Sequence, residues 1–198
     1  MNKKLRLILN KMKKLFGDIP YNLFGSMVLG HVRENGFLRN DIDLDFVIIE
    51  ENLDKLIDRF KKTFKNVEIS SEGVNNNVVL RPIDNTNIIR VIKFKLNGVS
   101  VDIAIAFLIG DYRYTLTHDN DLGYNFHKFP RRIFESSKMV DFEGGIYPVP
   151  NTPLEYVECE YGKDWRVKKD KWNCCFDPPC IDKKNSKELM EKLLESKK

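Results

Sequence analysis

The chain has 198 residues, of which 42% are hydrophobic and 31% charged, and its formal net charge is +4. This composition is typical of an ordinary globular protein and argues against disorder, and the length suits one domain with a proper core. The small positive excess is compatible with a phosphorylated substrate but does not indicate a nucleic-acid partner.

Hydropathy gives no sign of export or membrane insertion. No run of residues approaches the roughly eighteen apolar positions of a membrane span, and residues 5–9 are too short and interrupted for a signal-peptide core. The sequence therefore predicts a cytoplasmic protein without an integral membrane segment. The oligomeric state stays open.

Four cysteines lie in the last quarter of the chain: Cys159, Cys174, Cys175 and Cys180. The adjacent pair cannot easily form a disulfide with itself, and nothing indicates secretion. A structural zinc site of four thiolates is one expectation, although the usual Cys-x₂-Cys spacing is missing. Reduced thiols without a metal are the other.

The first part of the chain predicts a helix, a strand and a phosphate-binding turn. Residues 4–16 carry apolar side chains at helical spacing, and residues 19–24 suit a strand. Gly25 and Ser26 then precede a short helix expected at residues 27–32. Such a turn at a helix N-terminus can meet a phosphate with its N–H groups and hydroxyl, and Arg33 is the cation nearest to it in the sequence.

Alternating aspartates follow this turn. Side chains of a strand alternate between its faces. A strand at residues 42–49 would place three acids on one face and three apolar residues on the other: Asp41, Asp43 and Asp45 against Ile42, Leu44 and Phe46. Carboxylates this close resist ionising together unless a cation neutralises them, which favours a hard Mg²⁺ or Mn²⁺ ion. A phosphate turn and a metal-binding strand together indicate phosphoryl-transfer chemistry.

The middle of the chain reads as a helix and several strands. Residues 51–64 form an amphipathic pattern typical of a crossover helix. Four strand candidates follow, at residues 67–70, 78–81, 88–96 and 99–108. Turns at Glu72-Gly73 and at residues 75–77 separate the first two, and the hairpin turn Asn97-Gly98 joins the last two.

Asp102 interrupts the apolar run of the last of these strands. A lone acid in a buried strand is costly unless it lies at a sheet end, pairs with a base or binds a metal. We favour the metal, because a neighbouring strand could bring Asp102 beside Asp43 and Asp45.

The remaining segments carry weaker signals. Residues 111–130 show no clean period, so surface loops are expected there, with His118 and His127 as weak pocket candidates. Residues 146–150 suit an extended segment, residues 152–161 a helix stopped by Gly162, and residues 187–194 a short amphipathic helix.

Two sets of motifs resemble the LicD and fukutin family. Leu29-Gly30-His31-Val32-Arg33 before Asp41-Ile42-Asp43-Leu44-Asp45 is similar to that family's signature. The later motifs Phe142-Glu143-Gly144, Val149-Pro150-Asn151 and Tyr161-Gly162, with Trp165 shortly after, are similar to its closing region. The resemblance spans roughly residues 20–166. Arg39-Asn40 stands where similar proteins usually have Pro-Trp, and Glu34 where they often have His.

The resemblance implies an α+β fold: a nucleotidyltransferase-like mixed β-sheet flanked by helices, with a short C-terminal extension. It implies a catalytic domain over residues 1–166 and a charged, cysteine-containing tail with a short helix over residues 167–198. The implied activity is Mg- or Mn-dependent transfer of a phospho-alcohol, of phosphocholine or polyol-phosphate type, from a CDP-linked donor to a sugar or glycan hydroxyl, with release of CMP.

The resemblance also implies roles for individual residues. Asp43, Asp45 and Asp102 would bind the metal, and Asp41 would be the first acid of the triple. The donor phosphates would be held by Gly25, Ser26, Gly30 and Arg33. Two alternatives stay open: an NTP-dependent nucleotidyltransferase that releases pyrophosphate, and a non-catalytic nucleotide-binding module of the same fold.

Overall fold

The structure is a computed structural model that describes residues 2–70, 77–119, 121, 123–169, 171–183 and 185–197. The helices are α1 (Asn2–Phe16), α2 (Ser26–Glu34), the short 3₁₀ helix η1 (Glu50–Asn52), α3 (Leu53–Thr63), α4 (Arg132–Glu135), α5 (Pro153–Tyr161) and α6 (Ser186–Glu195). The strands are β1 (Asn22–Leu23), β2 (Asp43–Ile49), β3 (Val67–Ile69), β4 (Val78–Pro82), β5 (Ile89–Leu96), β6 (Val99–Ile109), β7 (Tyr112–Asp119), β8 (Gly123–Pro130), β9 (Ser137–Phe142) and β10 (Gly145–Pro150).

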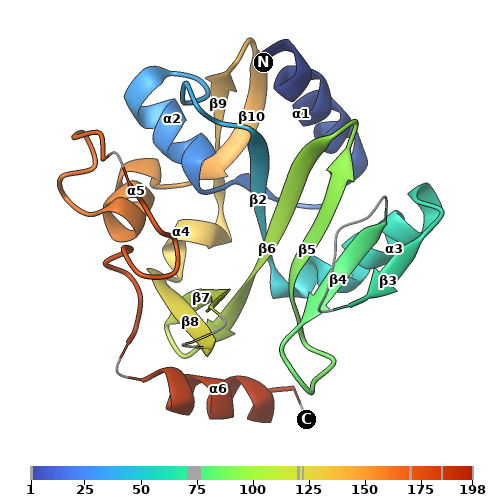
Figure 1. Ribbon diagram of the computed structural model, residues 1–198, viewed down its shortest axis with the longest axis vertical. Helices are drawn as coiled ribbons and strands as arrows, with labels where there is room; N and C mark the ends of the chain where they lie inside the picture. The colour runs from blue at the N-terminus through green and yellow to red at the C-terminus, as the bar shows by residue number, and fades with distance from the viewer. Residues whose placement is uncertain are drawn as a thin grey trace.

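One mixed sheet organises the described part of the chain, in the order β1-β2-β6-β5-β4-β3 (Figure 1). The central pair, β2 and β6, is parallel, whereas β5 is antiparallel to β6 and to β4. The hairpin of β7 and β8 extends the far end of β6, and β9 pairs with β10 in a separate two-stranded sheet. The expected α+β class with a mixed sheet is confirmed.

The core lies on the face of the sheet opposite the aspartates. Leu44 and Phe46 on β2 and Phe94 on β5 are buried there. Helix α1 brings the ring of Phe16 to 5.2 Å from that of Phe46, and α3 brings Phe60 to 5.5 Å from Phe94. These two helices therefore cover the apolar face and leave the opposite face to the site.

Strand β2 begins one residue later than expected, and the expected place of Ile42 is wrong. Ile42 was assigned to the apolar face, but its side chain is 69% exposed. The ladder with β6 begins at Asp43, which pairs with Ser100, so Ile42 precedes the pleated segment and the alternation does not apply to it.

The β5–β6 hairpin is confirmed. Asn97 and Gly98 have φ angles of 51° and 72°, the left-handed pair that a tight two-residue turn requires. The amphipathic helix expected at residues 51–64 is α3, with η1 as its lead-in. It connects β2 to β3, as a crossover helix does. Of the predicted turns between β3 and β4, residues 72, 73, 75 and 76 lie outside the described residues.

The surface loops expected at residues 111–130 are wrong, because this segment forms the β7–β8 hairpin. Both strands are rich in aromatic residues, and β7 also contains two threonines; both residue types favour strands. Buried side chains occur on both faces, since α5 and α6 also pack on this region, and a strand covered on both sides shows no clean alternation.

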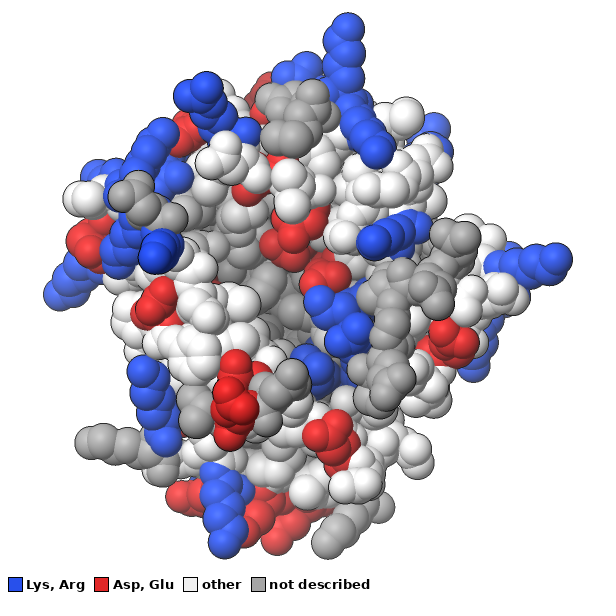
Figure 2. Space-filling model, viewed as in Figure 1, with Lys and Arg blue, Asp and Glu red and all other residues white. Residues whose placement is uncertain are grey.

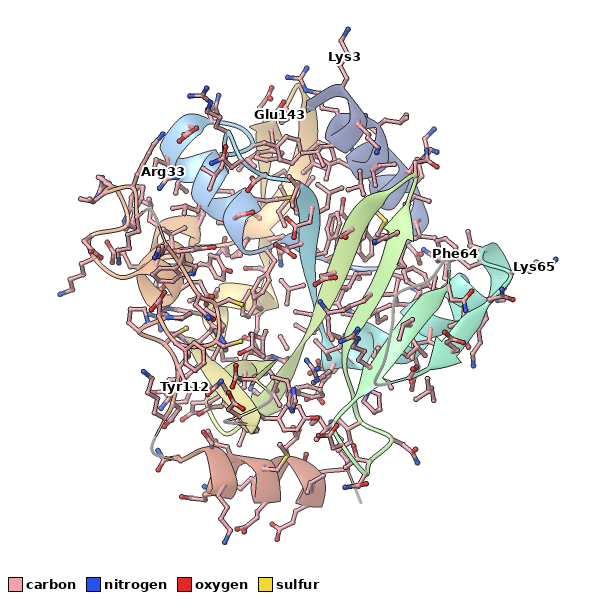
Figure 3. All side chains as sticks on the ribbon, in the orientation of Figure 1. Lys3, Arg33, Phe64, Lys65, Tyr112 and Glu143 are labelled. Atoms are coloured by element: carbon pink, nitrogen blue, oxygen red, sulfur yellow. The ribbon has the colours of Figure 1, made fainter. Side chains whose placement is uncertain are left out.

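The last helix, α6, packs against β6 and β8 with Leu189 and Leu193 buried (Figure 1). Glu143, in the turn between β9 and β10, accepts a hydrogen bond of 2.9 Å from the N–H of Phe37 and pairs with Arg6 of α1 at 2.6 Å (Figure 3). The β9–β10 turn thus fastens α1 to the loop that leads into β2. None of the helices in the described ranges has the length and apolar content to cross a membrane.

Phe94→Ala should lower the free energy of unfolding by about 3–5 kcal/mol, because it leaves a cavity among three packed rings. Urea denaturation of the purified protein measures this loss. Phe176→Ala is the matched control, since that ring is 37% exposed and its removal should cost much less. Equal losses in the two variants would contradict the packing described above.

Candidate functional site

Charged side chains form a row across the face of the sheet that α1 and α3 leave uncovered. Asp45 of β2 pairs in register with Asp102 of β6, and Asp102 pairs with Lys93 of β5. Asp43, two residues before Asp45, shares this face. Arg81 of β4 lies beyond, opposite Val91 of β5. The expectation that a neighbouring strand brings Asp102 beside Asp45 matches this register.

This row lies in a cleft with a volume of about 490 Å³. The sheet forms its floor, and the start of α2, the end of α5 and residues 172–175 form its walls. Figure 2 shows acidic and basic side chains next to one another near the middle of this face, where the surface is hollowed. A cleft of this volume, lined by both acidic and basic side chains, can hold a small ligand that carries charge.

The carboxylates of the cleft are crowded and only partly compensated. Burial, and then the charges of Asp43 and Asp102, raise the pKa of Asp45 well above its usual value. Burial and the charge of Asp102 also raise the pKa of Asp43. Lys93 forms an ion pair with Asp102 and is the cation that opposes both shifts. One lysine therefore faces three acids.

This donor set suits a hard divalent cation. Carboxylate oxygens are the ligands that Mg²⁺ and Mn²⁺ prefer, and Mg²⁺ is usually held by one or two carboxylates together with substrate phosphates. The three aspartates are not gathered as closely as a complete protein cage, since their oxygens do not all lie within 4.8 Å of one another. Asp43 and Asp45 therefore fit a metal that a bound phosphate completes.

Two arginines that the sequence reading missed line the same cleft: Arg81 and Arg90. The Nε atom of each is buried without a hydrogen-bond partner in the structure. Burial lowers the pKa of Arg90, and the adjacent charge of Arg81 contributes to that shift. Arg90 also lies over the ring of Tyr124, 5.5 Å from its centroid. Two close guanidinium groups, each with an Nε–H that no protein atom accepts, are suited to a phosphate. Alternation along β5 would have assigned Arg90 to the face opposite Lys93, and the register shift between β4 and β5 that leaves Arg90 outside the ladder was not visible in the sequence. Nor did the sequence show which strands would be neighbours.

The glycine–serine turn lies at the start of α2, beside Asp45. Gly25 has φ 55° and ψ −131°, and a Cβ built there would lie 3.0 Å from an Asp45 carboxylate oxygen. Its N–H donates a 2.9 Å hydrogen bond to the buried hydroxyl of Tyr156, so it does not face the cleft as the predicted cradle required. Ser26 does line the cleft. The turn therefore contributes the close packing of Gly25 against Asp45 and the hydroxyl of Ser26 to the cleft.

Asp41 is buried in the turn before β2, outside the sheet ladder. It accepts hydrogen bonds from the N–H of Leu38, at 3.0 Å, and from Ser26. Burial nevertheless raises its pKa. Asp41 lines the cleft and also holds the loop between α2 and β2 in place.

Gly30 and Arg33 lie apart from the aspartates. A Cβ on Gly30 would meet the carbonyl oxygen of Gly36 at 2.3 Å, so this glycine lets the following loop pack on α2. Arg33 lines a neighbouring cavity of about 340 Å³, together with Trp165 and Lys168 from the segment after α5 (Figure 3). Ser26 and Asp41 border both cavities. The sequence-predicted site is thus divided between two adjoining cavities.

The four cysteines do not form a zinc site, which corrects that expectation. In the described residues, the cluster whose donor atoms all lie within 4.8 Å of one another is His127, Glu160 and Cys180. Of the four thiols, only that of Cys180 belongs to this cluster. Cys159 lies in α5, and Cys174 is exposed. Sequence spacing missed the cluster because its members come from β8, α5 and the segment before α6.

Comparison with known proteins gives one family and a set of distant structures. The family model described as LicD/FKTN/FKRP, nucleotidyltransferase domain, matches residues 18–152. No curated protein matches. A Thermotoga maritima protein described as a candidate nucleotidyltransferase is 16% identical, with a TM-score of 0.44 and coverage of 78% of this chain and 81% of its own. The lincosamide antibiotic adenylyltransferase LnuA, with lincomycin bound, is 13% identical, with a TM-score of 0.40 and coverage of 79% and 84%.

Gly25→Ala should lower the free energy of unfolding by roughly 1–3 kcal/mol, because the new Cβ combines an unfavourable backbone angle with close contact to Asp45. Gly110→Ala is the matched control: its φ is also positive, at 59°, but nothing lies within 4 Å of the added Cβ. Thermal or urea unfolding of both variants measures the difference. A smaller loss at Gly25 than at Gly110 would contradict the close approach to Asp45.

Proposed function

Because the chain belongs to the LicD/FKTN/FKRP family and carries its nucleotidyltransferase domain, we propose that it is a metal-dependent phosphotransferase. It transfers a phospho-alcohol, of phosphocholine or polyol-phosphate type, from a CDP-linked donor to a sugar or glycan hydroxyl and releases CMP. The observation that carries this proposal is the cleft itself, in which carboxylates on β2 and β6 face the guanidinium groups of Arg81 on β4 and Arg90 on β5, whose buried Nε atoms have no hydrogen-bond partner.

Asp43 and Asp45 would hold the Mg²⁺ or Mn²⁺ ion, and Asp102 would be the third carboxylate of the set. When bound, the ion neutralises these acids and stabilises negative charge on the phosphoryl oxygens. Lys93 forms an ion pair with Asp102 and lines the same cleft, where its ammonium group would offset charge on a donor phosphate.

Arg81 and Arg90 bind the diphosphate of the donor, since hydrogen bonds between charged partners are the strong ones and the Nε–H of each arginine has no partner in the protein. Ser26 contributes its hydroxyl at the start of α2. Arg33, in the adjoining cavity, binds the part of the donor or acceptor that lies beyond the diphosphate.

Positioning accounts for most of the rate enhancement expected from such a site. The acceptor oxygen attacks the β-phosphorus, the bond from that phosphorus to the oxygen of CMP breaks, and CMP leaves with the bonding electron pair. The proton of the acceptor hydroxyl passes to a carboxylate of the cleft, for which Asp41 and Asp102 are the candidates.

A donor screen tests the function directly. The purified protein is incubated with CDP-choline, CDP-ribitol, CDP-glycerol and each of the four NTPs, with and without Mg²⁺, and CMP and pyrophosphate are quantified. Mg²⁺-dependent release of CMP from one CDP-alcohol supports the proposal. Release of pyrophosphate from an NTP would instead favour a nucleotide-adding enzyme, and metal-independent CDP binding without turnover a non-catalytic module.

Asp43→Asn should abolish transfer while the protein stays folded, because one metal ligand is lost and the repulsion among the remaining acids falls. Product release measures activity, and urea denaturation measures stability. Asp58→Asn, on the exposed side of α3, is the matched control and should keep full activity. Wild-type turnover by Asp43→Asn would remove the metal assignment.

Arg81→Gln and Arg90→Gln should each raise the KM for the donor on the order of tenfold or more, since a hydrogen bond to a charged group contributes about 1.5–3 kcal/mol. Steady-state kinetics with the identified donor measure the change. Arg131→Gln, whose guanidinium pairs with Glu135 on the surface, is the control and should leave the KM unchanged. An unchanged KM in both cleft variants would show that the donor phosphates lie elsewhere.

A further inference from the structure

Three side chains with metal-binding atoms meet where the C-terminal tail lies along β8. His127 comes from β8, Glu160 from α5 and Cys180 from the segment between α5 and α6. His127 is 2% exposed and Glu160 6% exposed. His127 and Glu160 also border the cleft of the aspartates. The proposed transfer reaction uses none of the three side chains, so their convergence calls for a separate explanation.

The spacing of the three donor atoms matches three corners of a zinc tetrahedron, which leaves the fourth position to water. Glu160 Oε2 lies 3.3 Å from His127 Nδ1 and 3.3 Å from Cys180 Sγ, and Cys180 Sγ lies 3.8 Å from His127 Nδ1. A tetrahedral zinc with bonds of about 2.0–2.3 Å has edges of about 3.3–3.8 Å between its ligand atoms. We propose that His127, Glu160 and Cys180 bind a zinc ion.

A neighbouring hydroxyl orients the histidine for this role. Thr117 Oγ1 of β7 lies 3.0 Å from His127 Nε2, on the other side of the ring from Glu160 and Cys180. When Nε2 carries the ring proton, it donates a hydrogen bond to Thr117 Oγ1. Nδ1 is then unprotonated, and its lone pair points toward Glu160 and Cys180. Ligating histidines usually make such a hydrogen bond with their second nitrogen, which fixes the tautomer.

The donor set distinguishes this metal from the ion at the aspartates. One nitrogen, one thiolate and one carboxylate form a set typical of zinc, whereas Mg²⁺ requires oxygen ligands. The charges of the thiolate and the carboxylate together balance one divalent ion. The two sites therefore select different metals.

The zinc would fasten the tail segment to the body of the protein. The N–H of Lys128 donates to the carbonyl oxygen of Cys180 at 2.9 Å, and the N–H of Asp182 donates to that of Phe126 at 2.9 Å. The segment thus already lies along β8, and the ion adds a bond to α5. Residues 174 and 175 of the same segment wall the catalytic cleft, so the ion would also hold that wall in place.

Cobalt substitution tests this inference in the full-length protein. Co²⁺ is titrated into metal-free protein with excess Mg²⁺ present, so that the oxygen site is occupied. Wild-type protein should bind one Co²⁺ with tetrahedral d–d bands and a thiolate-to-cobalt charge-transfer band, which Zn²⁺ abolishes by displacement. The band reports a sulfur ligand and cannot arise from the aspartates, so the result is independent of transferase activity.

Cys180→Ser separates a metal site from a hydrogen-bonded triad. Serine keeps a donor toward Glu160 but supplies no thiolate, so a purely hydrogen-bonded cluster would tolerate it. We expect the charge-transfer band to disappear and Zn²⁺ to cease raising the melting temperature, with folding verified by circular dichroism. Cys175→Ser is the control and should keep both responses, since its Sγ contacts the carbonyl of His118. No band in folded wild-type protein, or a band that survives Cys180→Ser, would overturn the proposal.

Discussion

The parallel pairing of β2 with β6 is the constraint on which the rest of the structure depends. It aligns Asp45 with Asp102, residues 57 positions apart in the sequence, and leaves apolar side chains of both strands to the opposite face. Parallel strands need a long connection, and here it runs through α3 and the strands at the other edge of the sheet. The same pairing thus creates both the crowded carboxylates on one face and the apolar surface on the other. Burial of that apolar surface by α1 and α3 stabilises the fold and so offsets the repulsion among the carboxylates.

Local patterns predicted the elements with a single buried face and failed where both faces are covered. The β5–β6 hairpin followed from Asn97-Gly98 and from alternation, and α3 from its apolar stripe. The β7–β8 hairpin was missed because packing on both sides hides the period of two. Ile42 was misplaced because alternation says nothing about where a ladder begins, which depends on the partner strand.

In the candidate site, too, some residues could be predicted from local sequence patterns and others could not. Crowded acids in one strand, and one acid in a second apolar strand, are visible in the sequence, and the expected neighbourhood of Asp102 and Asp45 agrees with the register. Arg81 and Arg90 were not visible, because an arginine in a strand is ordinary until the sheet order shows what it faces. Gly25 was read as a phosphate cradle, yet its N–H is taken by Tyr156, a contact that no local pattern reveals. Long-range pairing, more than residue type, limits such predictions.

The order of charges across the strands of the sheet has a consequence for how a ligand arrives. Negative side chains lie on β2 and β6, and positive ones on β5 and β4, so the strands carry a separation of charge with little net excess. Such a dipole exerts a weak pull at long range, but at short range it exerts a torque. It therefore selects the direction in which a bound molecule points more than it raises the frequency of encounters. Before the proposed metal ion binds, a ligand with a cationic end and an anionic end would enter this cleft in one orientation, and salt would weaken that alignment little, because interactions between partly buried charges are screened less than those between distant exposed ones.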